Sequence, residues 1–296
     1  MNENGTGSDG GYDIGSVDAV LPKGMARRAE TMGYEKAEQP ALSLVALAAM
    51  AGAYIAFGAT FAATVSVGLD DAVSAGFQRL VGGLAFSLAY VLAIVGGAEL
   101  FTTNNMMVMA WAHRRLSTLG LLRAWGIVLV GNFVGAVATG AMLVAAGLHT
   151  DLAGGVGASL LKSAEQLRAL GHGQAFFLGI LGNTLLCLGV WLTYSARSTT
   201  DRILALTPPV AAFYAMGLEH AIAVMFYLPC AALIQAFGGP DVVSSGPGSP
   251  MLLAGDFFSV LVPVTLGNIL GGGILVALMY WFVYLRSAVR GDESAR

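Results

Sequence analysis

One histidine of this chain, His220, lies deep inside a long apolar run, where a side chain that titrates near neutral pH can act on a ligand. The other three histidines, His113, His149 and His172, fall near the ends of apolar runs, where solvent reaches them. No second histidine or cysteine is placed beside His220, so we expect no metal and no other cofactor. Two interpretations follow. His220 either hydrogen-bonds a ligand or is a packing residue satisfied by its neighbours.

Two glutamates, Glu99 and Glu219, also fall inside apolar runs, each in the pattern Gly-x-Glu. A carboxylate in a membrane helix costs about 3 kcal/mol on insertion scales, so each one needs partners. One role for either glutamate is to accept hydrogen bonds from backbone N–H groups freed where a helix is interrupted. A second is to pair with a cation, for which Lys36 is a candidate. Both are therefore predicted to support the structure rather than to meet the ligand.

The elements that hold these residues are predicted to be membrane helices. Of the 296 residues, 56 % are hydrophobic and only 11 % are charged, and the mean hydropathy is +0.72. Ordinary globular domains carry about 25 % charged residues, so this chain cannot cover its surface with charge and lipid must face much of it. A net charge of −3 gives no reason to expect a nucleic-acid partner. Both cysteines, Cys187 and Cys230, lie in apolar runs and are expected to pack as small residues.

Six stretches have few or no charged residues, and each is long enough to supply the roughly 20 residues of a membrane span. We expect all six to be helices, because open-edged sheets cannot cross lipid. The stretches are 41–67, 80–112, 124–148, 173–195, 203–237 and 256–285.

Three parts of the chain follow from this pattern. Residues 1–39 form a polar arm whose first ~20 residues are predicted to be disordered, and residues 21–39 form either a short surface helix or a solvated arm. Residues 40–286 form a six-helix transmembrane domain, and 287–296 form a tail. Since the first apolar run starts only near Pro40, no cleavable signal peptide is expected.

The lysines and arginines predict the orientation. All but three of the 15, namely Arg79, Lys162 and Arg168, fall in the arm, the second and fourth loops and the tail. Because positive residues stay on the cytoplasmic side, both termini are predicted to lie in the cytoplasm of a cell that carries this multi-pass protein in its plasma membrane.

An internal repeat relates the first three segments to the last three. The second segment is interrupted at Gly96-Gly97-Ala98-Glu99 and the fifth at Gly217-Leu218-Glu219-His220, while the third and sixth share G-N-x-x-G at 131–135 and 267–271. Three helices per half make the repeat inverted, and matched glycine-interrupted segments are typical of a transport site. The alternative is two glycine-rich helices that only pack closely.

A lone buried histidine suits the passage of a small acid. A bare carboxylate faces a Born cost of tens of kcal/mol in a low-dielectric medium, whereas protonating an acid like that of Asp at pH 7 costs about 4 kcal/mol. His220 is therefore expected to hydrogen-bond the anion and to donate or hold its proton, with the Thr102 hydroxyl as a second contact. An apolar ring around them would exclude hydrated ions, although core packing is the competing explanation for each member. The ring comprises Phe86, Tyr90, Leu100, Phe101, Leu186 and Phe213.

Several motifs in order resemble the formate/nitrite transporter family over about residues 23–286. They are Leu80-Val81-Gly82-Gly83, Gly97-Ala98-Glu99-Leu100-Phe101-Thr102, Gly182-Asn183, Gly217-Leu218-Glu219-His220, Pro263-Val264-Thr265-Leu266-Gly267-Asn268 and the closing 280–286.

The resemblance implies a homopentamer with one pore per protomer and an all-α, aquaporin-like fold in which helices 2 and 5 are broken. It places His220 and Thr102 at the pore centre. One constriction comprises Phe86, Leu100 and Phe213, and the other Tyr90, Phe101 and Leu186. Lys36 helps to attract the anion, and Asn183 and Asn268 are supporting polar residues.

This chain departs from the family pattern at three positions. Tyr90 stands where formate channels carry Leu, and Val224 replaces an Asn four residues after the central histidine. A family Lys before helix 4 aligns with Leu167, so Arg168, one place on, is the candidate to take over its role.

The predicted function is transport of a small monovalent anion and a proton, formate first, with nitrite or hydrosulfide as the alternatives. A water channel would need Asn-Pro-Ala at both breaks, and no Asn here precedes Pro. An intramembrane enzyme would need a nucleophile or ligand set beside Glu99, Glu219 and His220, and none is present in the sequence, so no enzymatic activity is expected. Passive and proton-coupled transport both remain open.

Overall fold

The computed structural model describes residues 19–286 apart from 70–71, 240–241 and 243–250, and every regular element among them is a helix. The helices of the first half are listed here with their bounds: α1 (Pro22–Ala37), α2 (Ala41–Ser66), α3 (Ala75–Tyr90), the π-helical η2 (Val91–Val95), α4 (Phe101–Asn104), the 3₁₀ turn η3 (Asn105–Met107), α5 (Val108–Ala112) and α6 (Thr118–Ala145). Those of the second half are η4 (Leu148–Thr150), α7 (Gly155–Arg168), α8 (His172–Thr193), α9 (Thr199–Ala215), α10 (Ala221–Phe237), α12 (Ala254–Asn268), the π-helical η5 (Ile269–Leu278) and α13 (Met279–Tyr284).

Five helical stretches among the described residues are long and apolar enough to cross a membrane: 41–66, 75–95, 118–145, 172–193 and 254–284. The remaining predicted segment is divided into α9 and α10, neither of which is long enough alone. The division falls at residues 216–220, where the sequence predicts a break. The second segment is divided in the same way, between η2 and α4.

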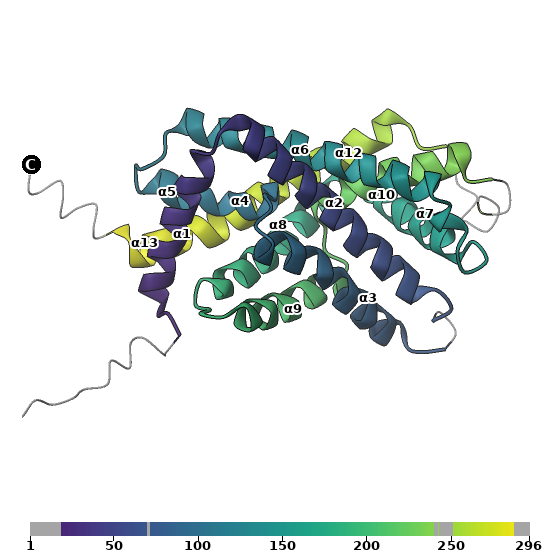
Figure 1. The fold of residues 1–296 in the computed structure, drawn as a ribbon, viewed down its shortest axis with the longest axis horizontal. Helices are drawn as coiled ribbons and strands as arrows, with labels where there is room; N and C mark the ends of the chain where they lie inside the picture. Colours follow the sequence, from purple (N-terminus) through teal and green to yellow (C-terminus); the bar gives the residue numbers. More distant parts are fainter. Residues whose placement is uncertain (1–18, 70–71, 240–241, 243–250, 287–296) are drawn as a thin grey trace, which may run out of the picture.

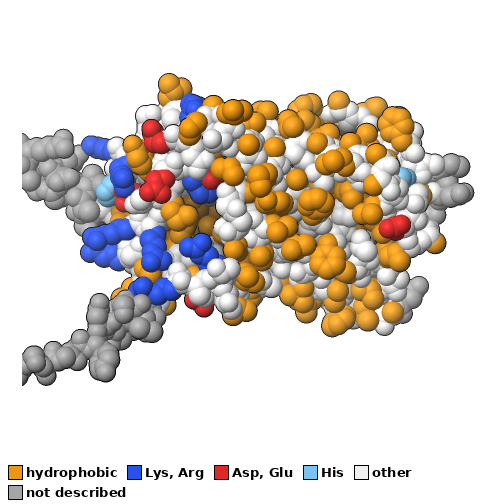
Figure 2. Space-filling view, in the orientation of Figure 1, with side chains coloured by type: hydrophobic (Ala, Val, Ile, Leu, Met, Phe, Trp, Pro, Cys, Tyr) orange, Lys and Arg blue, Asp and Glu red, His pale blue; other side chains and the backbone are white. Residues whose placement is uncertain are grey.

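The molecule is elongated, with α1, α5 and α13 at one end and α7 at the other (Figure 1). Lysine and arginine side chains gather at the α1 end, and hydrophobic side chains cover most of the rest of the visible face (Figure 2). The first and last described helices thus share the positively charged end of the molecule.

The G-N-x-x-G repeat is explained by two matched helix crossings. α6 packs on α2 so closely that a Cβ at Gly135 would overlap the backbone of Ala49, and a Cβ at Gly271 would overlap the backbone of Ile180 where η5 packs on α8. Only glycine allows this approach, and it brings the asparagine of each motif up against a helix break.

Two regions differ from, or add to, the sequence interpretation. The sequence predicts no membrane span in residues 149–172, yet they contain helix α7, which packs on α10 and α2. Within residues 21–39, helix α1 has a buried face that includes Met25, Ala26 and Ala29 and lies against α5, so this part is a docked helix rather than a solvated arm. The first 18 residues and the tail from 287 lie outside the described residues.

Candidate anion site

Three polar side chains meet at the centre of the molecule. The Nε2 atom of His220 lies 2.7 Å from Thr102 Oγ1 and 3.0 Å from the Tyr90 hydroxyl. All three residues have no solvent-exposed surface, and they come from three different elements. The two residues predicted to line the pore centre are therefore brought into direct contact, together with Tyr90.

The second helix break fixes the orientation of the His220 ring. His220 is the N-cap of α10, and its Nδ1 accepts a hydrogen bond of 3.2 Å from the backbone N–H of Ala223. Since the Nδ1 lone pair is in use, the neutral ring carries its proton on Nε2 and directs it at Thr102 and Tyr90. Protonating Nδ1 as well would remove this cap. The geometry therefore favours a hydrogen-bond donor over a ring that cycles through the imidazolium form.

The two breaks share one backbone design. Gly97 and Gly217 both have positive φ, +82° and +67°, which turns the chain out of the helix. Two residues later, the N–H of Glu99 donates to the Leu47 carbonyl and that of Glu219 donates to the Leu178 carbonyl. Each break is thereby tied to the first membrane-crossing helix of its own half, α2 or α8.

An asparagine clasps each break. Asn132 accepts from the Phe101 N–H at 2.9 Å and donates to the carbonyls of Ala48 and Glu99, both at 2.8 Å. The contacts with Phe101 and Glu99 satisfy backbone groups that the broken helix leaves without partners, and the contact with Ala48 ties the break to α2.

Asn268 repeats this arrangement at the second break. It accepts from the Ala221 N–H at 2.9 Å and donates to the carbonyls of Gly179 (2.8 Å) and Glu219 (3.2 Å). Asn183 connects the two halves, because its Nδ2 donates to the carbonyls of Thr102 and Asn268.

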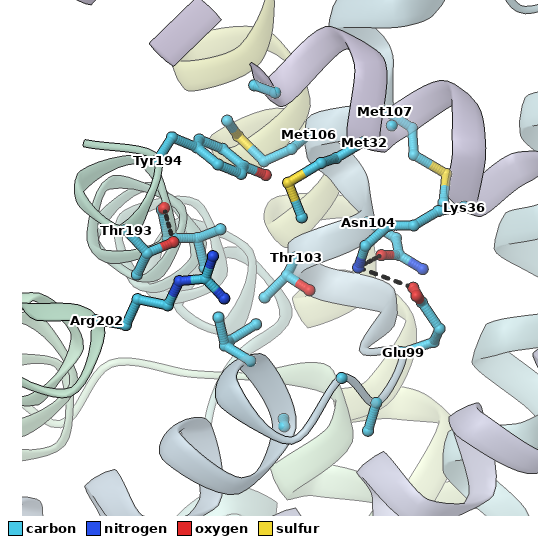
Figure 3. Close-up of a pocket in the computed structure, with 17 residues that line it drawn as sticks. Met32, Lys36, Glu99, Thr103, Asn104, Met106, Met107, Thr193, Tyr194 and Arg202 are labelled. Carbon is cyan, nitrogen blue, oxygen red and sulfur yellow. Dashed lines mark hydrogen bonds and ion pairs between the residues drawn. The ribbon is translucent and has the colours of Figure 1, made fainter. Parts of the chain in front are cut away.

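The first break carries a buried ion pair. The Lys36 ammonium, at the end of α1, lies 3.0 Å from Glu99 Oε2 and 3.3 Å from Asn104 Oδ1 (Figure 3). The Glu99 side chain is only 3 % exposed, so the lysine compensates a charge that solvent barely reaches. Lys36, the candidate cation of the sequence, thus pairs with Glu99 and joins α1 to the first break.

Two cavities approach the centre from opposite ends. The first, the α1-side cavity, has a volume of about 110 Å³ and is lined by Lys36, Arg202 and Thr103 together with the first break (Figure 3). The second, the α7-side cavity, has a volume of about 370 Å³ and reaches the second break. Its charged lining residues are Arg79, Lys162 and Glu219. His220, Thr102 and Tyr90 line neither cavity, so they lie in the closed section between them.

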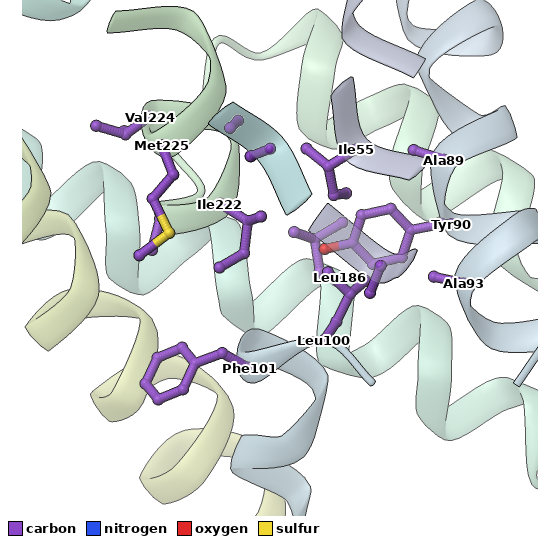
Figure 4. Close-up of a cluster of buried hydrophobic side chains, with 14 of the residues drawn as sticks. Ile55, Ala89, Tyr90, Ala93, Leu100, Phe101, Leu186, Ile222, Val224 and Met225 are labelled. Atoms are coloured by element: carbon purple, nitrogen blue, oxygen red, sulfur yellow. The ribbon is translucent and has the colours of Figure 1, made fainter. Parts of the chain in front are cut away.

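The predicted apolar ring separates into groups. Phe86 and Phe213 both line the α7-side cavity, and their rings stack with centroids 6.2 Å apart. Tyr90, Leu100 and Leu186 lie together in the closed section (Figure 4). The Phe101 ring points away from Tyr90 and packs edge-on against Trp125 of α6, at 5.9 Å.

At the α7 end, the cationic residue that lines the cavity is not the one that the sequence alignment suggests. Arg168 lies 3.6 Å from Glu165, whereas Leu167 and Lys162 line the α7-side cavity. In the sequence Lys162 indicates only the orientation in the membrane, and no motif there places it at the site. Val224 is fully buried one turn after His220 and offers it no polar group.

Arginines at the α1 end were also used only for orientation. Arg27, Arg28, Arg197 and Arg202 line an open hollow between α1 and the start of α9, and Arg202 reaches the α1-side cavity as well. Their clustering depends on how α1 docks, which no spacing in the sequence reveals. Among the described residues, no three His, Cys, Asp or Glu side chains gather where they could hold a metal ion.

The comparisons with known proteins agree with this geometry. A family model described as formate/nitrite transporter matches residues 23–282. The chain belongs to the formate/nitrite transporter family. The formate channel FocA of Escherichia coli K12 is 38 % identical over 274 residues, which cover 91 % of this chain and 96 % of FocA. A probable formate transporter of Methanothermobacter thermautotrophicus is 34 % identical over 280 residues, covering 90 % and 97 %.

Solved structures of this family share the fold. One, described as a pentameric formate channel with formate bound, has a TM-score of 0.77 at 36 % identity and covers 83 % of this chain and 98 % of its own. Another, described as an FNT family ion channel, has a TM-score of 0.74 at 26 % identity and covers 88 % and 98 %. The predicted all-α, aquaporin-like membrane fold with broken helices 2 and 5 is therefore confirmed, as is the family.

Proposed function

We propose that this protein is a membrane channel for small monovalent anions, formate first, and that the anion passes between Thr102 and His220. One observation carries the proposal. A buried histidine, with its Nε2 turned toward two hydroxyls, lies between two cavities that each contain cationic side chains.

Charge at both ends supports anion entry. Arg202 and Lys36 line one cavity, and Arg79 and Lys162 line the other. Clefts lined with one sign of charge raise the local concentration of the opposite ion. At the α1 end the one carboxylate of the break, Glu99, is paired with Lys36, so its repulsion of an anion is reduced.

The closed apolar section sets the chemistry of passage. A carboxylate that leaves water for this section meets a large desolvation penalty, which protonation to the neutral acid lowers. Nε2–H of His220 and the Thr102 hydroxyl donate hydrogen bonds to the anion as it loses water. Because Nδ1 is held as the cap of α10, His220 has no second proton to give. The substrate therefore accepts from these donors as the anion, and the proton that crosses with it is exchanged with water in the two cavities.

Assembly and location follow from the same proposal. We infer a homopentamer with one pore per protomer, as in the neighbour described as pentameric. The protein lies in the plasma membrane with both termini in the cytoplasm, because the positively charged end holds both α1 and α13. The arm (1–39) and tail (287–296) flank the transport domain. Nitrite and hydrosulfide are the alternative substrates, and the residues that meet at the centre suit transfer of an intact anion rather than catalysis.

Reconstituted liposomes test this function. Uptake of formate, nitrite and hydrosulfide is measured with an internal pH dye for the wild type, His220→Asn and the control His172→Asn, which changes an exposed histidine. Asparagine can still cap α10 but removes the imidazole. We expect formate flux to fall about 10-fold to 100-fold in His220→Asn, the effect of one hydrogen bond to a charged group, and to stay unchanged in the control.

The outcomes separate the proposals. Dominant flux of nitrite or hydrosulfide keeps the site and changes the substrate. Wild-type liposomes that take up no anion faster than empty ones, although the protein is folded and pentameric, would overturn anion transport itself. Normal formate flux in His220→Asn would remove the histidine from the mechanism.

A further inference from the structure

Tyr90 contacts the same histidine nitrogen as Thr102, and its role goes beyond narrowing the path. Building on the proposed function, we infer that Tyr90 is a specificity-determining residue whose O–H is a third donor to the bound anion. It selects an anion with two acceptor oxygens, the carboxylate or nitrite class, over a single-atom sulfur anion such as hydrosulfide.

The Tyr90 ring is held firmly enough for its hydroxyl to have one position. It is the last residue of α3, directly before the π-helical turn η2, and it has no exposed surface. Its ring meets the His220 ring edge-on, with centroids 5.9 Å apart, and lies 6.5 Å from the Phe86 ring. In Figure 4 the ring is surrounded by Ile55, Leu100 and Leu186, and its oxygen points into this cluster. The hydroxyl therefore cannot swing out to water.

Counting protons shows that the empty site has a donor to spare. Nε2 of His220, Oγ1 of Thr102 and the hydroxyl of Tyr90 carry one proton each. Nε2–H only donates, since Nδ1 is the acceptor of the ring. The contacts of Nε2 therefore use one proton, and a contact between the two hydroxyls uses a second. The third proton has no acceptor among these three groups, and an arriving anion supplies one.

The number of donors then decides which anion fits. A carboxylate has two oxygens with about four lone-pair positions, so it can accept from all three groups at once. Sulfur is a weak acceptor, and a single sulfur atom leaves buried hydroxyl protons poorly satisfied. Binding hydrosulfide therefore costs more with the Tyr90 hydroxyl present than in a site made of His220 and Thr102 alone, because one more buried proton is left without a good acceptor.

The test compares Tyr90→Phe with the control Tyr54→Phe in liposomes. Phenylalanine keeps the ring and removes only the hydroxyl, and Tyr54 is a half-buried residue of α2 outside the two cavities. Initial uptake rates of formate and of hydrosulfide are measured at alkaline pH, with empty liposomes subtracted. We expect the formate-to-hydrosulfide ratio to fall about 10-fold in Tyr90→Phe, the effect of one donor to a charged acceptor, and to be unchanged in Tyr54→Phe.

Each outcome bears on one proposal. An unchanged ratio in a folded Tyr90→Phe pentamer that still conducts formate overturns the role of Tyr90 and leaves the proposed function intact. Higher formate flux at an unchanged ratio shows that the hydroxyl only plugs the path, which also overturns it. If Tyr90→Phe does not fold, the wild type decides, because hydrosulfide uptake as fast as that of formate contradicts the selection. A wild type that conducts neither anion refutes the proposed function instead.

Discussion

The two helix breaks have nearly the same backbone and very different side chains. At both, a glycine with positive φ, a glutamate tied through its N–H and an asparagine clasp hold the chain open. The residue after the glutamate is Leu100 at the first break and His220 at the second. The repeat thus supplies the same backbone scaffold twice. The side chains that meet at the site come from matched positions that differ, His220 against Leu100 and Thr102 against Ile222.

The glutamates show a second difference. Glu99 is almost fully buried and pairs with Lys36, which anchors α1 to the first break. Glu219 is half-buried and lines the α7-side cavity with Lys162 and Arg79. The first break therefore serves to attach a neighbouring helix, whereas the second faces a wide cavity and holds the histidine. The comparison predicts that substitutions at matched residues of the two breaks destabilise the protein equally. Substitutions at residues that differ between the breaks should have unequal effects.

The largest loss of stability is expected when the asparagine that bridges each break, Asn132 or Asn268, is replaced. Asn132→Ala and Asn268→Ala each leave one N–H and one carbonyl group at a break without their partner, at about 1–3 kcal/mol per group. The third bond of each asparagine goes to a carbonyl inside α2 or α8, which keeps its helical hydrogen bond. Neither variant should yield a stable protein in thermal unfolding of the detergent-solubilised form. Thr139→Ala, which removes one bond within α6, is the control and should unfold near the wild-type temperature. A clasp variant as stable as this control would show that its break is held by other contacts.

The ion pair should give the next largest effect, and only at the first break. Lys36→Met leaves the Glu99 charge buried without its cation and is expected to lower the free energy of unfolding by about 3 kcal/mol. Adding Glu99→Gln should recover most of that loss, because the unpaired charge is gone. The double-mutant cycle is measured by chemical denaturation. Independent, additive effects of the two changes would mean that the pair contributes no coupling.

Backbone strain should give the smallest effect, and it should be equal at the two breaks. Gly97→Ala and Gly217→Ala force alanine into positive φ, and an added Cβ at either position meets nothing within 4 Å. Each is expected to lower the free energy of unfolding by about 1–2 kcal/mol. Gly126→Ala, in the middle of α6 with similar free space, should instead be neutral or stabilising. Losses that differ by several-fold between the breaks would contradict their equivalence.

Much of this comparison could be predicted from the sequence because it depends on local patterns. The Gly-x-Glu pattern identified both breaks, the G-N-x-x-G pattern identified the matching third and sixth segments, and apolar length identified the spans. Asn132 was visible in the second motif, but its bonds to the first break were not, because they depend on how α6 crosses α2. Its match with Asn268 was the signal that could have revealed the role.

Features that depend on distant packing could not be predicted. The contact between Tyr90 and His220 joins residues 130 positions apart. Helix α7 could not be predicted as a span because it is short and less apolar than the spans. The way it packs on α10 and α2 places Lys162 rather than Arg168 at the cavity. The direction of the Phe101 ring depends on Trp125, which lies on another helix.

The central claim is that the second break presents Nε2–H of His220 to the anion while Nδ1 remains the cap of α10. The most direct measurement is solid-state NMR of ¹⁵N-histidine-labelled protein in lipid, with and without formate, in which the signals missing from His220→Asn identify this ring. The account predicts a protonated Nε2 whose shift changes with formate and an unprotonated Nδ1 in both states. Signals of a doubly protonated ring, or an Nε2 shift unaffected by formate, would contradict it.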